Sequence, residues 1–191
     1  PDPFGGRVPA VLLRFDDPEA LRDSLRGVST LYNTYWVRFD RRDTTHERAV
    51  RNSSVLIRAA VEAGVRRLVH ISITNPTLDS SLPYFRGKAE VERMVHSSGL
   101  SHAVLRPTVL FGGQDILINN IAWLLRRFPL FAIPGDGQYR LQPVCVEDLA
   151  ELAVGSAGKR DNLTLDAVGP EAFTFDELVR MLAKAVHSRA R

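Results

Sequence analysis

The stretch that decides the fold runs from Arg66 to Gly113 and reads RRLVHISITNPTLDSSLPYFRGKAEVERMVHSSGLSHAVLRPTVLFGG. Its apolar residues 68–71 predict a buried strand, the segment beginning near Tyr84 predicts a helix, and residues 103–105 predict a second strand. This order is typical of the right-handed crossovers of a parallel sheet. Ser72 and Thr74 follow the first strand, at the edge of such a sheet where ligands gather.

Tyr84 and Lys88 are four positions apart where the loop gives way to the helix. Residues at this spacing lie on one helix face, so the tyrosine hydroxyl and the lysine ammonium can converge. An ordinary tyrosine has a pKa of about 10, and a nearby cation favours its charged form. Such a tyrosine can exchange a proton with a substrate hydroxyl or carbonyl. The same spacing also occurs by chance in many helices. This pair is a candidate because predicted strands flank the helix on both sides.

The residues before this stretch predict two more strand and helix pairs. Residues 8–15 predict a strand, followed by a helix with Asp17 as N-cap and Pro18 in its first turn. Residues 29–35 predict the next strand. A capping-box spacing of Thr44 and Glu47 predicts a long helix to about residue 63.

The residues after Gly113 predict a mixed region. Asp115 can cap an apolar helix that Pro129 ends, and Gly135 to Gly137 predicts a turn. Cys145 lies in a predicted short strand, where a small buried apolar role is expected. A last strand at residues 163–168 precedes a helix with a staple and capping box at residues 173–178.

Composition excludes several classes. The chain has 191 residues, 45% hydrophobic and 25% charged, as expected for a globular protein. Its charge of +3 is scattered, so no nucleic-acid partner is expected. The single cysteine excludes an internal disulfide, and the five histidines lack metal-ligand spacing, so no metal is expected. Without a long apolar run or a leader, the chain is expected to lack a membrane span and to be cytoplasmic.

The chain resembles the short-chain dehydrogenase/reductase family, within the extended and atypical branch that includes NAD-dependent epimerases/dehydratases, NmrA-like proteins and a complex I subunit. The resemblance is carried by AAVEAGVRRLVHIS (59–72), YFRGK (84–88), LRPTVLFG (105–112), PGDGQYRLQPVCVEDLA (134–150) and LTLDAVGPEAFTFDELV (163–179). It implies an α/β fold with a Rossmann-like parallel sheet flanked by helices and a small substrate-side α+β appendage. The expected segments are a partial NAD(P)-binding domain at 1–112, a substrate-side segment at 113–162, and the last strand and helix at 163–191.

The resemblance also implies roles for single residues. Tyr84 would be the general acid/base, Lys88 would lower its pKa and bind the nicotinamide ribose, and Ser72 or Thr74 would orient the substrate oxygen. The implied cofactor is NAD or NADP, and the residues expected near it are Asn33, Thr34, Ser72, Lys88, Pro107 and Thr108. Asn119 or Asn120 could meet a small-molecule substrate. Ser72, Thr74 and Asn33 could equally be structural, because such side chains commonly satisfy turns.

Several departures from the family pattern leave alternatives open. The glycine-rich phosphate loop and its first β-α-β unit are missing, so the chain is expected to be truncated at both ends relative to the family. Arg14 occupies a position where the family has an acid, and Ile73 one where it has a hydroxyl. An oxidoreductase or epimerase/dehydratase is therefore one hypothesis, a non-catalytic dinucleotide-sensing or assembly protein a second, and an inactive fragment a third. A homodimer is what the family suggests.

Overall fold

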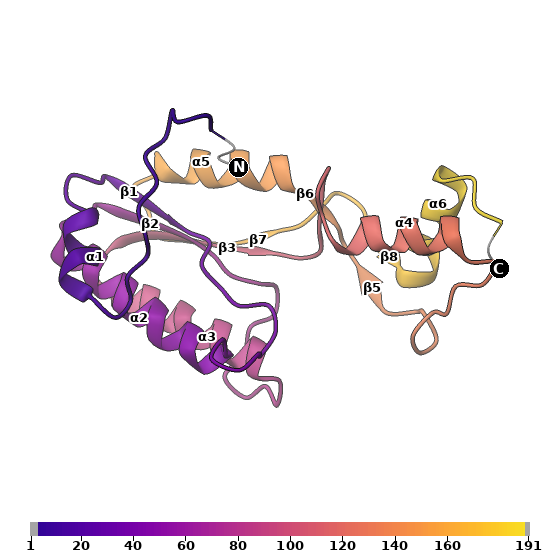
Figure 1. Ribbon diagram of the computed structural model, residues 1–191, viewed down its shortest axis with the longest axis horizontal. Helices are drawn as coiled ribbons and strands as arrows, with labels where there is room; N and C mark the ends of the chain where they lie inside the picture. The colour runs from indigo at the N-terminus through magenta and orange to yellow at the C-terminus, as the bar shows by residue number, and fades with distance from the viewer. Residues whose placement is uncertain (1–3, 190–191) are drawn as a thin grey trace. The chain divides into compact units, whose positions relative to one another are not determined.

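The computed structural model describes residues 4–189, whose course is drawn in Figure 1. The chain forms two compact units, each discontinuous in sequence. The first unit comprises residues 4–70, 76–104 and 160–163, and the second comprises residues 71–75, 105–159 and 164–189.

A four-stranded sheet has the strand order β1-β2-β3-β7. The strands are β1 (Thr30–Asn33), β2 (Arg67–Ile71), β3 (Ser101–Pro107) and β7 (Leu163–Ala167). β1 pairs in parallel with β2, in a register that runs from Thr30 opposite Arg67 to Asn33 opposite His70. The sheet is parallel and flanked by helices, which confirms the predicted Rossmann-like α/β fold.

The helices of the first unit are α1 (Pro18–Ser24), α2 (His46–Glu62) and α3 (Pro83–Ser97). Figure 1 shows α2 and α3 side by side along one face of the sheet, where they contact each other. Their apolar faces pack with β2 and β3 in a buried cluster of Val50, Ile57, Leu68, Val91, Val95 and Val104. Burial of each such side chain stabilises the fold by roughly 1.5–3 kcal/mol, so this cluster fixes α3 to the sheet.

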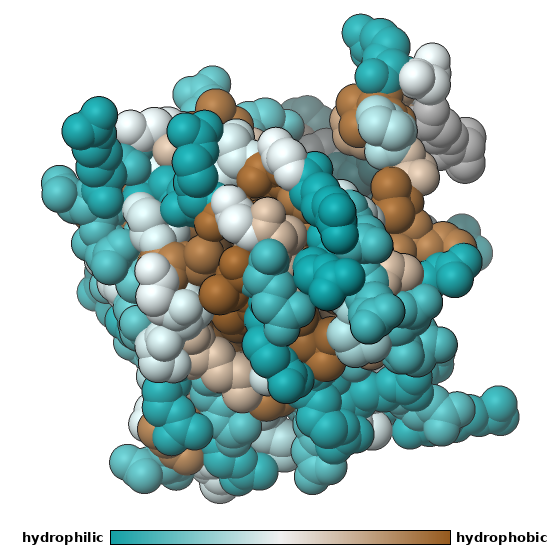
Figure 2. All heavy atoms as spheres, turned by 90° about the vertical axis from the view of Figure 1, so that its left-hand side faces the viewer, coloured by the Kyte–Doolittle hydropathy of each residue, from teal (hydrophilic) through white to brown (hydrophobic). Residues whose placement is uncertain are grey.

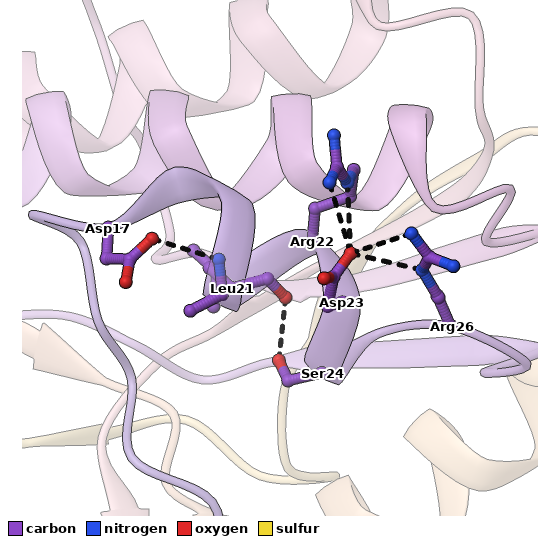
Figure 3. A network of polar contacts seen from close by, with 7 residues as sticks. Asp17, Leu21, Arg22, Asp23, Ser24 and Arg26 are labelled. Carbon is purple, nitrogen blue, oxygen red and sulfur yellow. Dashed lines mark hydrogen bonds and ion pairs between the residues drawn. The ribbon is translucent and has the colours of Figure 1, made fainter.

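Helix α1 begins as predicted, with the Asp17 carboxylate accepting from the Ala20 N–H at 3.0 Å and with proline in its first turn. Further along, Asp23 accepts from Arg22 at 3.2 Å and from Arg26 at 3.1 Å, as Figure 3 shows. The Arg22 hydrogen bond is the main reason that the pKa of Asp23 is below its ordinary value. Figure 2 shows the face of the molecule on which α1 lies, with hydrophobic side chains gathered inside a hydrophilic border.

Two predictions for the first 45 residues are wrong. Residues 9–14 form no strand, and Val11, Leu12 and Leu13 are all exposed, because a strand needs a partner to pair with its backbone groups. Helix α2 is capped by Thr45 instead of Thr44: the Thr45 hydroxyl accepts from the Arg48 N–H at 3.1 Å. The backbone N–H and C=O groups of Thr44 are hydrogen-bonded to the backbone of Arg41 in an isolated antiparallel bridge.

The second unit contains short strands and three further helices. These are β4 (Leu110–Phe111), α4 (Leu117–Arg127), β5 (Arg140–Leu141), β6 (Val144–Cys145), α5 (Val146–Ala157), β8 (Phe173–Thr174) and α6 (Phe175–Ala185). β4 pairs in parallel with β6, and β5 pairs antiparallel with β8. α4 and α6 pack through a buried cluster of Ile121, Leu125, Phe175 and Val179.

The local signals of this unit are mostly confirmed. The predicted capping box forms between Thr174 and Glu177, and Gly135 and Gly137 both have positive φ in the expected turn. The N-cap residue of α4 is Ile116 and not the predicted Asp115, although the Asp115 carboxylate accepts from the Ile118 N–H in the first turn at 2.7 Å. The burial predicted for Cys145 is wrong: the residue is half-exposed, because its thiol points to the Glu147 carboxylate and donates to it at 2.7 Å.

Candidate active site

Tyr84 and Lys88 lie in the first two turns of α3, which begins at Pro83. Gly87, between them, has a packing role. A Cβ atom at this position would lie 3.0 Å from Cη2 of Trp36 and 3.2 Å from Cγ2 of Val50. Glycine therefore allows the indole of Trp36 to rest directly on the helix, next to the two candidate residues.

The ring of Tyr84 belongs to an aromatic cluster made by Trp36, His46 and Tyr84. The Tyr84 ring stands edge-on to His46, with centroids 5.5 Å apart, and edge-on to Trp36, with centroids 6.0 Å apart. Trp36 and His46 are stacked at 6.0 Å. Asp40 lies beside this cluster, with its carboxylate 2.8 Å from His46 Nδ1 and accepting from the His46 backbone N–H at 2.7 Å. Trp36, from the loop after β1, and His46, at the start of α2, thus both pack against the tyrosine ring.

The electrostatic surroundings of Tyr84 differ from the prediction. Burial raises the pKa of Tyr84 above its ordinary value of 10.0, and the nearby cation that lowers this pKa is Arg38. The expectation that Lys88 lowers the pKa of Tyr84 is wrong, because the desolvation of the ring outweighs the effect of charge. At neutral pH the tyrosine is therefore a phenol, able to donate a proton.

Lys88 is a buried cation on this helix, with 4% of its surface exposed. Its Nζ atom lies 4.7 Å from the centre of the Trp36 ring, which is a cation–π contact. Burial lowers the pKa of Lys88 to about 8, and Glu92, one turn further along, acts in the opposite direction. A buried amine that titrates close to neutral pH is a feature of functional sites.

Asn33 is the last residue of β1, and it is paired in register with His70, the penultimate residue of the neighbouring strand β2. The Asn33 side-chain oxygen accepts from the Tyr35 N–H at 3.0 Å, and its amide nitrogen lies 3.1 Å from His70 Nδ1. His70 Nδ1 is therefore the acceptor, and the proton of the neutral ring is on Nε2. Burial lowers the pKa of His70 to about 3, with a smaller contribution from the charge of Lys88.

Ser72 and Thr74 belong to the second unit, together with Pro107 and Thr108. The Ser72 N–H donates to Leu105 O at 2.7 Å, and the Thr74 N–H donates to Pro107 O at 3.0 Å, so their backbones continue the pairing with β3. Thr108 donates its hydroxyl to Gln142 O. Within residues 4–189 the buried Ser72 hydroxyl has no hydrogen-bond partner. A buried polar atom of this kind is suited to a ligand oxygen.

The remaining predicted residues have clear positions. Asn33 is buried and committed to Tyr35 and His70, whereas its neighbour Thr34 is exposed. Asn119 and Asn120 are exposed on α4, and the Asn119 amide donates to the Asp115 carboxylate at 2.9 Å. These predicted contacts with ligands remain predictions.

Sequence reasoning missed three residues of the site, Trp36, His46 and His70. Trp36 and His46 lie in and after the loop that follows β1, and no periodic pattern links them to Tyr84. His70 could have been found, since it is a polar residue in an apolar run that ends opposite Asn33. Within the described part of the chain, no cluster of three or more metal-ligating side chains occurs, and none of its helices has the length and apolarity to cross a membrane.

Two curated relatives are named as mitochondrial proteins. The chain is 27% identical over 197 residues to NADH dehydrogenase (ubiquinone) 1 alpha subcomplex subunit 9 of Dictyostelium discoideum, covering 87% of this chain and 54% of the relative. It is 27% identical over 177 residues to the protein of the same name in Mus musculus, covering 90% of this chain and 46% of the relative. The chain thus spans about half the length of these relatives.

Solved structures share the fold. The dTDP-glucose 4,6-dehydratase from Streptomyces venezuelae, solved with NAD bound, is 23% identical with a TM-score of 0.74, over 91% of this chain and 62% of that one. The UDP-N-acetylglucosamine 4-epimerase from Bacillus cereus is 15% identical with a TM-score of 0.77, over 95% of this chain and 69% of that one. A family model described as NmrA-like family matches residues 8–127, which is more than half of the 191 residues. The chain therefore belongs to the NmrA-like family.

Proposed function

We propose that this chain is an NAD(P)-binding unit of the short-chain dehydrogenase/reductase type, in which Tyr84 and Lys88 act on a small hydroxyl or carbonyl substrate. The observation that carries the proposal is the buried Lys88, with its pKa lowered to about 8, one turn after a tyrosine that is a phenol at neutral pH. The neighbouring folds solved with NAD support the choice of cofactor.

Each unit contains a residue whose chemistry suits a dinucleotide. Lys88 is a buried cation that could donate hydrogen bonds to ribose hydroxyls, and Ser72 carries a buried hydroxyl without a partner among residues 4–189. Thr34, Pro107 and Thr108 are the further residues proposed to border the cofactor. The bound nicotinamide would supply or accept a hydride at the substrate carbon.

Tyr84 supplies the proton in this proposal. In the reducing direction its phenol donates the proton to the carbonyl oxygen as charge develops there, and Arg38, the nearby cation, stabilises the phenolate that remains. In the oxidising direction the phenolate takes the proton back from a substrate hydroxyl. Ser72 or Thr74 would orient the substrate oxygen. The raised pKa of Tyr84 makes the reducing direction the easier one at neutral pH.

The test is turnover of NADH or NADPH with a panel of aldehydes, ketones and nucleotide sugars. Tyr84→Phe keeps the ring packed on His46 and Trp36 but removes the proton, so the rate should fall by roughly 10²–10⁴-fold. Tyr32→Phe is the matched control, since Tyr32 is exposed on β1 and should tolerate the change. Turnover that is unchanged in Tyr84→Phe would show that Tyr84 does not transfer the proton.

A second candidate is a dinucleotide-binding protein without turnover. It is supported by the contact between the Lys88 ammonium and Trp36, and by the printed names of the curated relatives, which are subunits of NADH dehydrogenase. On this proposal the site would bind the dinucleotide as a structural or sensing element. Binding that is equal in the parent protein and in Tyr84→Phe, with no turnover across the panel, would favour this candidate over the enzyme.

A further inference from the structure

A groove with basic walls lies between the ends of α4 and α6 in the second unit. It has a volume of about 430 Å³, and its basic lining residues are Arg126, Arg127, His187 and Arg189. The two helices are held together by their buried apolar cluster and by the Ser188 hydroxyl, which donates to Leu125 O. Among residues 4–189, no aspartate or glutamate lines the groove.

The arginines of this groove are not neutralised by the part of the chain that the structure describes. Within residues 4–189 neither Arg126, Arg127 nor Arg189 forms an ion pair, whereas Arg180 on α6 is paired with Asp176 at 2.7 Å. Cations in the last turn of a helix are favoured by the helix dipole, which accounts for basic residues at the end of α4. That effect does not account for the apolar side chains exposed beside them.

Three large apolar side chains are exposed next to these arginines. The exposed fractions are 57% for Trp123, 48% for Phe128 and 73% for Leu130. The rings of Trp123 and Phe128 touch, with centroids 6.0 Å apart, and Trp123 and Arg127 lie four residues apart on one face of α4. Side chains of Trp, Phe and Leu alternating with arginine are typical of segments that lie in the interface of a bilayer.

We infer that the α4 tip, defined as Trp123, Arg126, Arg127, Phe128 and Leu130 with Arg189 of the same groove, binds the surface of an anionic phospholipid bilayer. The guanidinium groups contact headgroup phosphates, and the rings and Leu130 enter the boundary of the acyl region. Charge complementarity favours an anionic surface, since the groove has basic residues and no acidic ones in its lining. Leu130 and Phe128, which precedes Pro129, are exposed apolar side chains that favour a lipid partner over a nucleic acid. Proteins that bind nucleic acid rely instead on aromatic side chains that stack on the bases and on contacts with the phosphates.

The experiment is sedimentation of the protein with vesicles of phosphatidylcholine alone or with added phosphatidylglycerol. The protein should bind the anionic vesicles and should not bind the neutral ones. The binding should weaken as the salt concentration is raised. The chain has two tryptophans, so Trp36→Phe leaves Trp123 as the reporter, and its emission should shift to the blue on binding. The double variant Arg126→Glu, Arg127→Glu should bind at least about 25-fold more weakly, at roughly fivefold for each cation.

A matched control has the same change of charge elsewhere. Lys159 and Arg160 are both exposed, and Lys159→Glu, Arg160→Glu should bind like the parent protein. Trp123→Ala should weaken binding to anionic vesicles about tenfold, whereas salt dependence should persist. The inference would be overturned if the two double variants lost binding to anionic vesicles equally, or if the protein bound neutral and anionic vesicles equally well. It would also be overturned if the protein bound neither kind of vesicle, or if it bound RNA or DNA tightly in place of lipid. None of these outcomes depends on Tyr84, Lys88 or a cofactor.

Discussion

The Nζ atom of Lys88 lies 4.7 Å from the centre of the Trp36 ring. The face of the indole carries partial negative charge, so this contact offsets part of the cost of burying the ammonium. Trp36 itself rests on α3 at Gly87, close to the Tyr84 ring. A residue from the loop after β1 thus determines the surroundings of both candidate catalytic residues.

Replacement of Lys88 by methionine removes a buried titrating charge, so the stability of the variant relative to the parent should be about 1–3 kcal/mol more favourable at pH 7 than at pH 10. The folded protein holds this proton less tightly than the unfolded chain, with a pKa of about 8 against 10.5. Protonation therefore disfavours the folded state below pH 8, and this penalty fades as the pH rises toward 10.5. Urea unfolding should show a larger gain for Lys88→Met at pH 7 than at pH 10.

Lys159→Met is the control for the preceding variant, because Lys159 is exposed and should have little effect on stability at either pH. A stability difference between Lys88→Met and the parent that is the same at pH 7 and at pH 10 would contradict the lowered pKa of Lys88.

His70 should make the protein sensitive to acid. Its pKa in the folded protein is about 3, whereas its ordinary value is 6.5, so the unfolded chain binds the proton first. The stability associated with the neutral ring is complete above about pH 6.5 and is lost as the pH falls toward 3. His70→Gln, which can still accept from Asn33, should flatten the fall in unfolding free energy between pH 6 and pH 4. An unchanged slope would show that another group controls this range.

Gly87 should not tolerate a larger side chain. A β-branched residue here would push against Trp36 and Val50, so Gly87→Val should destabilise the protein by about 1–3 kcal/mol. Gly155 is the matched control, since it also lies within a helix but has open space around it. Gly155→Val should be near neutral in thermal unfolding. Equal effects of the two substitutions would contradict the packing of Trp36 on α3.

Gly169 should be the most sensitive glycine of the second unit. A Cβ atom there would lie 1.8 Å from the carbonyl oxygen of Pro143, which is a backbone atom and cannot turn aside. Gly169→Ala should therefore cost more than about 3 kcal/mol or prevent folding. Gly113→Ala has open space and should leave the melting temperature nearly unchanged. A folded Gly169→Ala protein with parental stability would refute this close approach.

Much of the fold could be predicted from local chemistry. The strand, helix and strand around Tyr84 follow from apolar periodicity, and the caps at Asp17 and Thr174 follow from residues that satisfy the first N–H groups of a helix. Residues 9–14 misled the prediction, because an apolar pattern does not tell whether a partner strand is available. Pairing is a property of the tertiary structure.

The candidate site was only partly predictable. The spacing of Tyr84 and Lys88 placed both on α3, but the shift of each pKa depends on burial in the folded chain. Trp36 and His46, which pack against Tyr84, come from another part of the sequence. No spacing rule connects these residues to the helix. Cys145 shows the same limit, since its half-exposed position depends on Glu147 and on how the short strand ends.

Titration of the protein with NADH and NADPH, followed by nicotinamide fluorescence, tests most directly whether Lys88 serves a bound dinucleotide. We predict saturable binding of one of them in the micromolar range, weakened at least about tenfold in Lys88→Met and unchanged in Lys159→Met. Failure of both cofactors to bind the folded protein, or equal binding by the parent and Lys88→Met, would contradict the assignment of this site.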